Sequence, residues 1–157
     1  MESRIFIHGL ESSGQGTKGF FFKNRFPEML TPDFTGDLAE RMIRLDRILE
    51  GRSGIKIVGS SFGGLMASLY AMKHESRVNR LILLAPALNL IGFLGIETKK
   101  IDTPVWVFHG EKDEVIPLET VEKTAQSLFN NLVFNRVKDN HVLKDTFKDM
   151  DWNELLE

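Results

Sequence analysis

One short stretch of the chain places a serine between a strand pattern and a helix pattern. Residues 55–58 are mostly apolar and β-branched, which favours a buried strand, and residues 65–72 favour a helix. The turn between them is Gly59-Ser60-Ser61-Phe62-Gly63-Gly64. A Gly-x-Ser-x-Gly turn at this position holds its serine in a strained conformation, and the small glycines leave room for it. The pattern therefore predicts that the hydroxyl of Ser61 stands clear of a sheet, near the positive end of a helix.

The rest of the chain alternates between strand and helix patterns. We expect strands at 4–8, 28–31, 55–58, 80–85, 103–110 and 132–137, and helices at 17–26, 38–49, 65–72, 118–129 and 143–156. Several of these strands are apolar throughout, so both of their faces must be covered. The sequence therefore predicts an α/β fold, a three-layer αβα sandwich with a mostly parallel sheet.

Composition limits the size and the class of the protein. The 157 residues predict a single domain over 1–157, and 42% hydrophobic with 27% charged residues is ordinary for a globular protein. A net charge of -2 gives no reason to expect nucleic acid, and the absence of cysteine excludes disulfides and thiolate sites. No apolar run reaches the roughly 20 residues of a membrane span, and no signal peptide is recognised, so a cytoplasmic location is expected.

The segment at about 87–101 is apolar but interrupted by glycines. It includes Leu88, Ile91 and Phe93, and its length suits a minimal lid-like excursion between a strand and the next strand. A lid, a pocket wall and a dimer contact are all open uses for it. Oligomeric state stays open between monomer and homodimer.

Titratable residues follow several of the predicted strands. Because the carboxyl ends of parallel strands meet at one edge, loops carrying His8, Ser61, Asp113 and His141 should converge there. A serine nucleophile needs a base, and the base needs a carboxylate to orient it. His141, after the last strand, is the candidate base, and Asp113 is the candidate acid. Three other carboxylates remain possible partners on residue type alone, namely Glu111, Glu114 and Asp139.

The motifs taken together resemble a known family. Phe6-Ile7-His8-Gly9-Leu10, Pro32 to Gly36, GSSFGG, His109 to Pro117 and finally His141 are similar to a compact α/β-hydrolase of the small bacterial esterase type without a cap domain. The resemblance covers nearly the whole chain. It implies Ser61 as nucleophile, Asp113 as acid and His141 as base, with the backbone amides of Leu10 and Phe62 as the oxyanion hole.

The resemblance also carries expectations about topology and reaction. Because the strand before His8 comes first, the two N-terminal antiparallel strands of larger members are missing, which implies six strands in the order 2-1-3-4-5-6. The implied reaction is hydrolysis of a small or medium acyl ester or thioester, without metal or organic cofactor. Amide or peptide hydrolysis, acyl transfer and a non-catalytic binding role are the alternatives. The substrate pocket is expected at His8, Gly9, Leu10, Phe62, Leu88, Ile91, Phe93 and Val115, while His8, His74 and His109 are expected to be structural.

Overall fold

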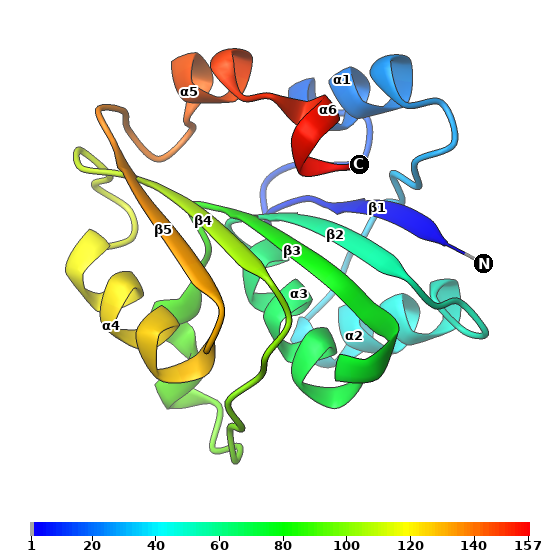
Figure 1. Cartoon of the computed structure of the whole chain (residues 1–157), viewed down its shortest axis with the longest axis horizontal. Coiled ribbons are helices and arrows are strands. Elements are labelled where there is room, and N and C mark those ends of the chain that lie inside the picture. Colours follow the sequence, from blue (N-terminus) through cyan, green and yellow to red (C-terminus); the bar gives the residue numbers. More distant parts are fainter. Residues whose placement is uncertain (1) are drawn as a thin grey trace.

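The computed structural model describes residues 2–157 and contains a parallel sheet between two layers of helices (Figure 1). The strands are β1 (Ser3–Ile7), β2 (Ile55–Ser60), β3 (Val78–Leu84), β4 (Val105–Gly110) and β5 (Leu132–Val137). They form a 5-stranded sheet in the order β1-β2-β3-β4-β5, and every neighbouring pair is parallel. The expected αβα sandwich is therefore confirmed.

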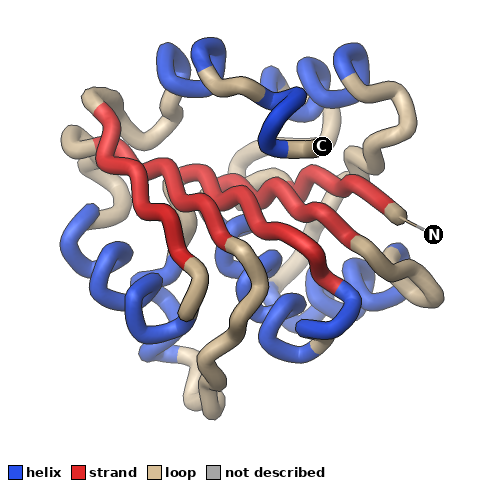
Figure 2. The backbone as a smooth tube through the Cα atoms, viewed as in Figure 1, coloured by secondary structure: helices blue, strands red, loops and turns tan. Residues whose placement is uncertain are grey.

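The helices divide between the two faces of the sheet (Figure 2). One face is covered by α2 (Leu38–Ile48), α3 (Phe62–Lys73) and α4 (Leu118–Leu128), and the other by α1 (Thr17–Arg25), α5 (Lys144–Asp149) and α6 (Trp152–Leu155). Short 3-10 helices, η1 (Glu75–Arg77) and η2 (Leu88–Phe93), flank β3. The sheet thus separates two hydrophobic clusters, one under each helix layer.

The expectation of six strands was wrong by one strand. Residues 28–31 form only a single bridge, in which Leu30 pairs with Ile5 on the outer side of β1. Two backbone bonds hold it, from Phe6 N–H to Leu30 O and from Leu30 N–H to Arg4 O, each 2.9 Å long. Pro32 is the next residue that would donate an amide to β1, and it has no N–H, so the pairing cannot extend beyond Leu30 in that direction. Its place beside β1 is nevertheless the one implied by the order 2-1-3-4-5-6.

The expectation of one closing helix over 143–156 was also wrong. The backbone of Met150 is extended, and this residue separates α5 from α6. The Asp151 side chain then caps α6 by accepting a hydrogen bond from the Glu154 amide at 3.1 Å. The Trp152 indole donates to the Phe147 carbonyl oxygen at 3.1 Å and ties the two short helices together. A capping residue and a buried indole therefore override the continuous helical pattern.

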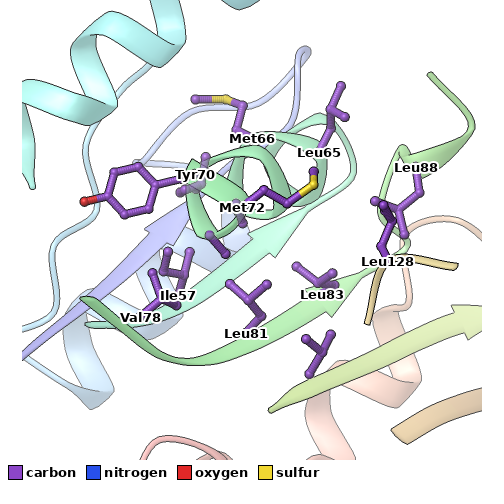
Figure 3. Packing of buried hydrophobic residues seen from close by; sticks show 14 of the residues in the cluster. Ile57, Leu65, Met66, Tyr70, Met72, Val78, Leu81, Leu83, Leu88 and Leu128 are labelled. Carbon is purple, nitrogen blue, oxygen red and sulfur yellow. The ribbon is translucent and has the colours of Figure 1, made fainter. Parts of the chain in front are cut away.

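The helix α3 is largely buried against the sheet (Figure 3). Its Leu65, Met66 and Tyr70 pack with sheet residues such as Ile57, Leu81 and Leu83, and all of these side chains are fully buried. Burial of each such side chain contributes about 1.5–3 kcal/mol. This packing fixes the start of α3, where Ser61 lies.

The segment at 87–101 begins as part of this core. Leu88 and Ile91 are buried and belong to the cluster shared with α3 and α4, whereas Phe93 is 86% exposed. Ile96 and the residues after it run along the C-terminal half of α3, beside Leu69 and Met72. No helix within residues 2–157 is long and apolar enough to cross a bilayer.

Candidate active site

Ser61 lies in a strained turn between β2 and α3. Its backbone has φ 55° and ψ -115°, a region that side-chain-bearing residues rarely occupy. A Cβ at Gly59 would lie 2.5 Å from the Gly63 carbonyl oxygen, and a Cβ at Gly63 would collide with the backbone of Ile7 and His8. Both glycines are therefore required by close backbone packing, which agrees with the sequence prediction.

The hydroxyl of Ser61 begins a chain of hydrogen bonds through three side chains. Ser61 Oγ lies 3.2 Å from His141 Nε2. His141 Nδ1 lies 2.8 Å from Asp113 Oδ2. A carboxylate only accepts, so the proton of the neutral imidazole is on Nδ1 and the Nε2 lone pair faces the serine hydroxyl. This tautomer is the one that can take a proton from Ser61.

The carboxylate of Asp113 is buried, and both of its oxygens accept hydrogen bonds. Its side chain has 0% exposure. Oδ1 accepts from the amides of Val115 and Ile116, at 2.9 and 2.8 Å. The other three carboxylates considered from sequence lie elsewhere: Glu111 and Glu114 are exposed, and Asp139 accepts from Thr146 and Asn140. Asp113 is thus the carboxylate that contacts His141.

A second histidine, His109, lies on the other side of the same carboxylate. Its side chain is fully buried, with Nε2 2.9 Å from the Ile116 carbonyl oxygen and 3.3 Å from Asp113 Oδ2. Burial lowers the pKa of His109 below its ordinary value of 6.5, although the Ile116 carbonyl and Asp113 oppose the shift. The ring is therefore neutral and donates through Nε2, and it braces the turn that carries the acid.

His8 also has a bracing role, as expected. Its Nε2 accepts from the Phe34 amide at 2.8 Å, so Nδ1 carries the proton and donates to the Gly9 carbonyl oxygen at 2.6 Å. The ring is 1% exposed. His8 therefore links the loop after β1 to residue 34 and does not line the cavity. His74, at the far end of α3, pairs with Asp46 at 3.3 Å.

A cavity of about 530 Å³ opens beside Ser61. It is bounded by parts of β1 and β2, the loop after β1, the start of α1 and the loops that carry Asp113 and His141. Its lining residues are Phe6, Gly9, Leu10, Glu11, Ser12, Thr17, Lys18, Ser60, Ser61, Val115, His141 and Val142. Leu10, Val115 and Val142 are 54%, 67% and 58% exposed, so they form an apolar rim around the opening.

The cavity includes some expected pocket residues and leaves others out. Gly9, Leu10 and Val115 line it together with Ser61 and His141. His8, Phe62, Leu88, Ile91 and Phe93 do not, because they pack in the core or face solvent elsewhere. Sequence reasoning missed the wall formed by Glu11, Ser12, Thr17 and Lys18. The available signal was their place in the loop after the first strand, at the same carboxyl edge as Ser61.

Comparison with known proteins gives one family match. The model of the α/β hydrolase fold family matches residues 11–96, more than half of the chain. A search of curated proteins gave no match.

Solved structures share the fold at low sequence identity. Alpha/beta hydrolase domain-containing protein 10 from mouse is 20% identical, with a TM-score of 0.71 over 90% of this chain and 82% of that one. Est1E from Butyrivibrio proteoclasticus with bound ferulic acid is 15% identical, with a TM-score of 0.72 over 100% and 90%. An alpha-beta serine hydrolase homologue from Coxiella burnetii is 16% identical, with a TM-score of 0.69 over 94% and 80%.

Proposed function

Because the chain belongs to the α/β hydrolase fold family, we propose that it is a hydrolase that cleaves acyl esters or thioesters through a covalent intermediate on Ser61. The observation that carries this proposal is the continuous contact from Ser61 Oγ to His141 Nε2, 3.2 Å, and from His141 Nδ1 to Asp113 Oδ2, 2.8 Å. In this proposal Ser61 is the nucleophile, His141 the general base and Asp113 the acid that orients it.

The reaction proceeds in two stages. His141 Nε2 takes the hydroxyl proton as Ser61 Oγ attacks the carbonyl carbon, and then donates that proton to the departing oxygen or sulfur. Water attacks the resulting acyl-enzyme and gives a proton to His141, which returns it to Ser61 as the acid leaves. The buried, fully bonded carboxylate of Asp113 stabilises the imidazolium in both stages without taking its proton.

In this proposal, two backbone amides stabilise the negative oxygen of the intermediate. The Phe62 amide is the first of α3, so no earlier helical turn supplies it with an acceptor, and it lies at the positive end of the helix. The Leu10 amide belongs to the loop that Gly9 brings close to the serine: a Cβ at Gly9 would lie 3.3 Å from Ser61 Cβ. Such donors typically contribute about 10²–10³-fold each to kcat.

The open mouth and apolar rim favour a small or medium acyl group. Leu10, Val115 and Val142 can cover a short apolar chain, and no residue of 87–101 is among those that line the cavity. The alcohol of an ester, or the thiol of a thioester, can leave once His141 has donated one proton to it.

Comparison of the neighbouring serines tests the assignment. Turnover of p-nitrophenyl butyrate by Ser61→Ala should fall by about 10⁴-fold or more, the scale seen on loss of a triad member. Ser60→Ala is the matched variant, because Ser60 also borders the cavity but no hydrogen bond links its hydroxyl to His141. Equal activity in the wild type and Ser61→Ala would refute the proposal. Parallel assays with a butyryl thioester and a butyramide then rank the leaving groups.

A further inference from the structure

The cavity beside Ser61 has one cationic wall. Lys18, in the first turn of α1, borders the cavity together with Ser12 and Thr17, and the apolar side chains of Val115 and Val142 border it as well. Lys18 is the only lysine or arginine among the lining residues. A substrate bound there meets hydroxyl groups, an ammonium and apolar side chains.

The ammonium of Lys18 is held in place. Its Nζ donates to the Val142 carbonyl oxygen at 2.8 Å and lies 5.5 Å from the centre of the Phe147 ring. An ammonium has three N–H donors, so this carbonyl leaves donors free. Within residues 2–157, no carboxylate forms a salt bridge with Lys18.

Other charges around Lys18 do not occupy the same space. Asp139 is close enough to raise the pKa of Lys18, while burial, the larger effect, lowers it. The Asp139 carboxylate accepts from Thr146 and Asn140 and is not among the cavity residues. Glu11 borders the cavity but is exposed, so water screens its charge. The partly dehydrated ammonium is therefore the positive charge that a bound substrate meets at this wall.

We propose that this enzyme selects esters or thioesters that carry an anionic group, with Lys18 binding that group while the acyl carbon lies at Ser61. The proposal rests on the proposed hydrolase function and specifies its substrate class. Thr17 and Ser12 supply hydroxyl donors on the same wall. A carboxylate or a phosphate would satisfy this chemistry.

A matched pair of substrates tests the proposal. Mono-p-nitrophenyl glutarate and p-nitrophenyl valerate have acyl chains of equal carbon number and differ at the chain end, which is a carboxylate in one and a methyl group in the other. The wild type should have a kcat/KM at least about 5-fold higher for the glutarate ester, the scale of one partly exposed ion pair. A second pair, 4-carboxyphenyl valerate and phenyl valerate, places the charge on the leaving group and shows which side faces Lys18.

Variants of Lys18 and Glu11 separate two roles of the lysine, which are binding of an anionic group and support of the His141 loop through Val142. Lys18→Met should reduce the ratio of kcat/KM between the charged and the uncharged ester to about one. Lys18→Arg keeps the positive charge and should keep this ratio. Glu11→Gln removes the nearby negative charge and should raise the preference about 2-fold. Added salt should weaken the wild-type preference. If Lys18→Met fails to fold, the arginine and glutamine variants and the salt series still decide.

The outcomes distinguish this inference from the proposed function. If Lys18→Met lowers kcat/KM for both members of each pair equally, Lys18 only anchors the loop of His141 through Val142, and the inference is overturned. The same holds if the wild type shows no preference in either pair. Failure of the proposed function would instead appear as no Ser61-dependent turnover of any of the four esters.

Discussion

The two sides of the cavity beside Ser61 are constructed differently. On one side is the elbow, residues 59–64, where a Cβ added at Gly59, Gly63 or Gly64 would lie within 3 Å of atoms of neighbouring segments. On the other is the α1 wall, comprising Leu10, Glu11, Ser12, Thr17 and Lys18, where side chains face an open space. In the proposed reaction, the elbow positions the serine that reacts, and the wall presents exchangeable side chains to the substrate. Mutations should therefore affect folding and chemistry on the first side and selectivity on the second.

The largest expected effect is at Gly63. Replacement by alanine drives a Cβ into the backbone of Ile7 and His8, and backbone cannot move aside as a flexible side chain can. Gly63→Ala should lose about 3 kcal/mol or more of unfolding free energy in urea denaturation. Gly92→Ala is the control, because nothing lies within 4 Å of its added Cβ, and it should change stability by less than about 1 kcal/mol. Equal stability of the two variants would show that the elbow is not tightly packed.

The next effect concerns the pH dependence of stability that comes from His109, the buried histidine beside Asp113. His109 resists protonation when folded, because its pKa is lowered by burial, whereas the unfolded chain takes up the proton near 6.5. Its contribution to stability is therefore full above pH 6.5 and is lost as the pH falls below it, by at most about 1.4 kcal/mol per pH unit.

His109→Gln tests this dependence while keeping a donor in reach of the Ile116 carbonyl oxygen. Thermal unfolding between pH 8 and 5 should show a shallower loss of stability for the variant than for the wild type. Parallel curves would contradict the account of a buried neutral ring. The substitution also changes the stability at every pH, so the relevant readout is the slope of stability against pH.

A smaller effect is expected from relief of strain at Ser61. Glycine accepts the φ of 55° that serine tolerates poorly. The free energy of unfolding of Ser61→Gly should therefore rise by about 1 kcal/mol, while turnover is lost. Ser61→Ala keeps the strain and should be nearly neutral for stability. Ser127→Gly, on the exposed face of α4, is the reference for glycine in an unstrained position and should lose about 0.5–1 kcal/mol. A loss of stability in Ser61→Gly equal to that reference would mean that the turn stores no strain.

The smallest effect is expected on the α1 wall. Leu10→Ala should raise the KM for p-nitrophenyl hexanoate by less than about 5-fold relative to the acetate, because the side chain is 54% exposed and only part of its surface is lost to the substrate. Stability should hardly change, since the backbone amide stays. Phe20→Ala removes a side chain that is 67% exposed but lies outside the cavity, and its chain-length preference should match the wild type.

The sequence was most informative where the backbone itself sets the geometry. The turn around Ser61 and the parallel layers both follow from local pattern and steric rules. The sequence predicts the contact of Asp113 with His141 only through spacing and resemblance, because Glu111, Glu114 and Asp139 are the same kind of group. Asp113 is singled out by the folded turn, where its carboxylate is buried, accepts from the amides of Val115 and Ile116, and contacts His141.

Sequence reasoning failed where burial depends on distant partners. Leu88 and Ile91 have the composition of a pocket wall, but the gap between α3 and α4 takes them into the core. Lys18 has the pattern of an ordinary surface helix residue, and only the approach of the loop at Val142, 124 positions later in the chain, brings its ammonium to the cavity. Such long-range contacts have no local signature.

The central claim is that Ser61 is a nucleophile activated by His141. The most direct measurement is labelling with a fluorophosphonate followed by peptide mass spectrometry to locate the adduct. We predict a single adduct on Ser61 in the wild type, none in Ser61→Ala, and labelling slowed by about 10²-fold or more in His141→Ala, because the general base is lost. An adduct on another serine, or equal labelling of wild type and Ser61→Ala, would contradict the account.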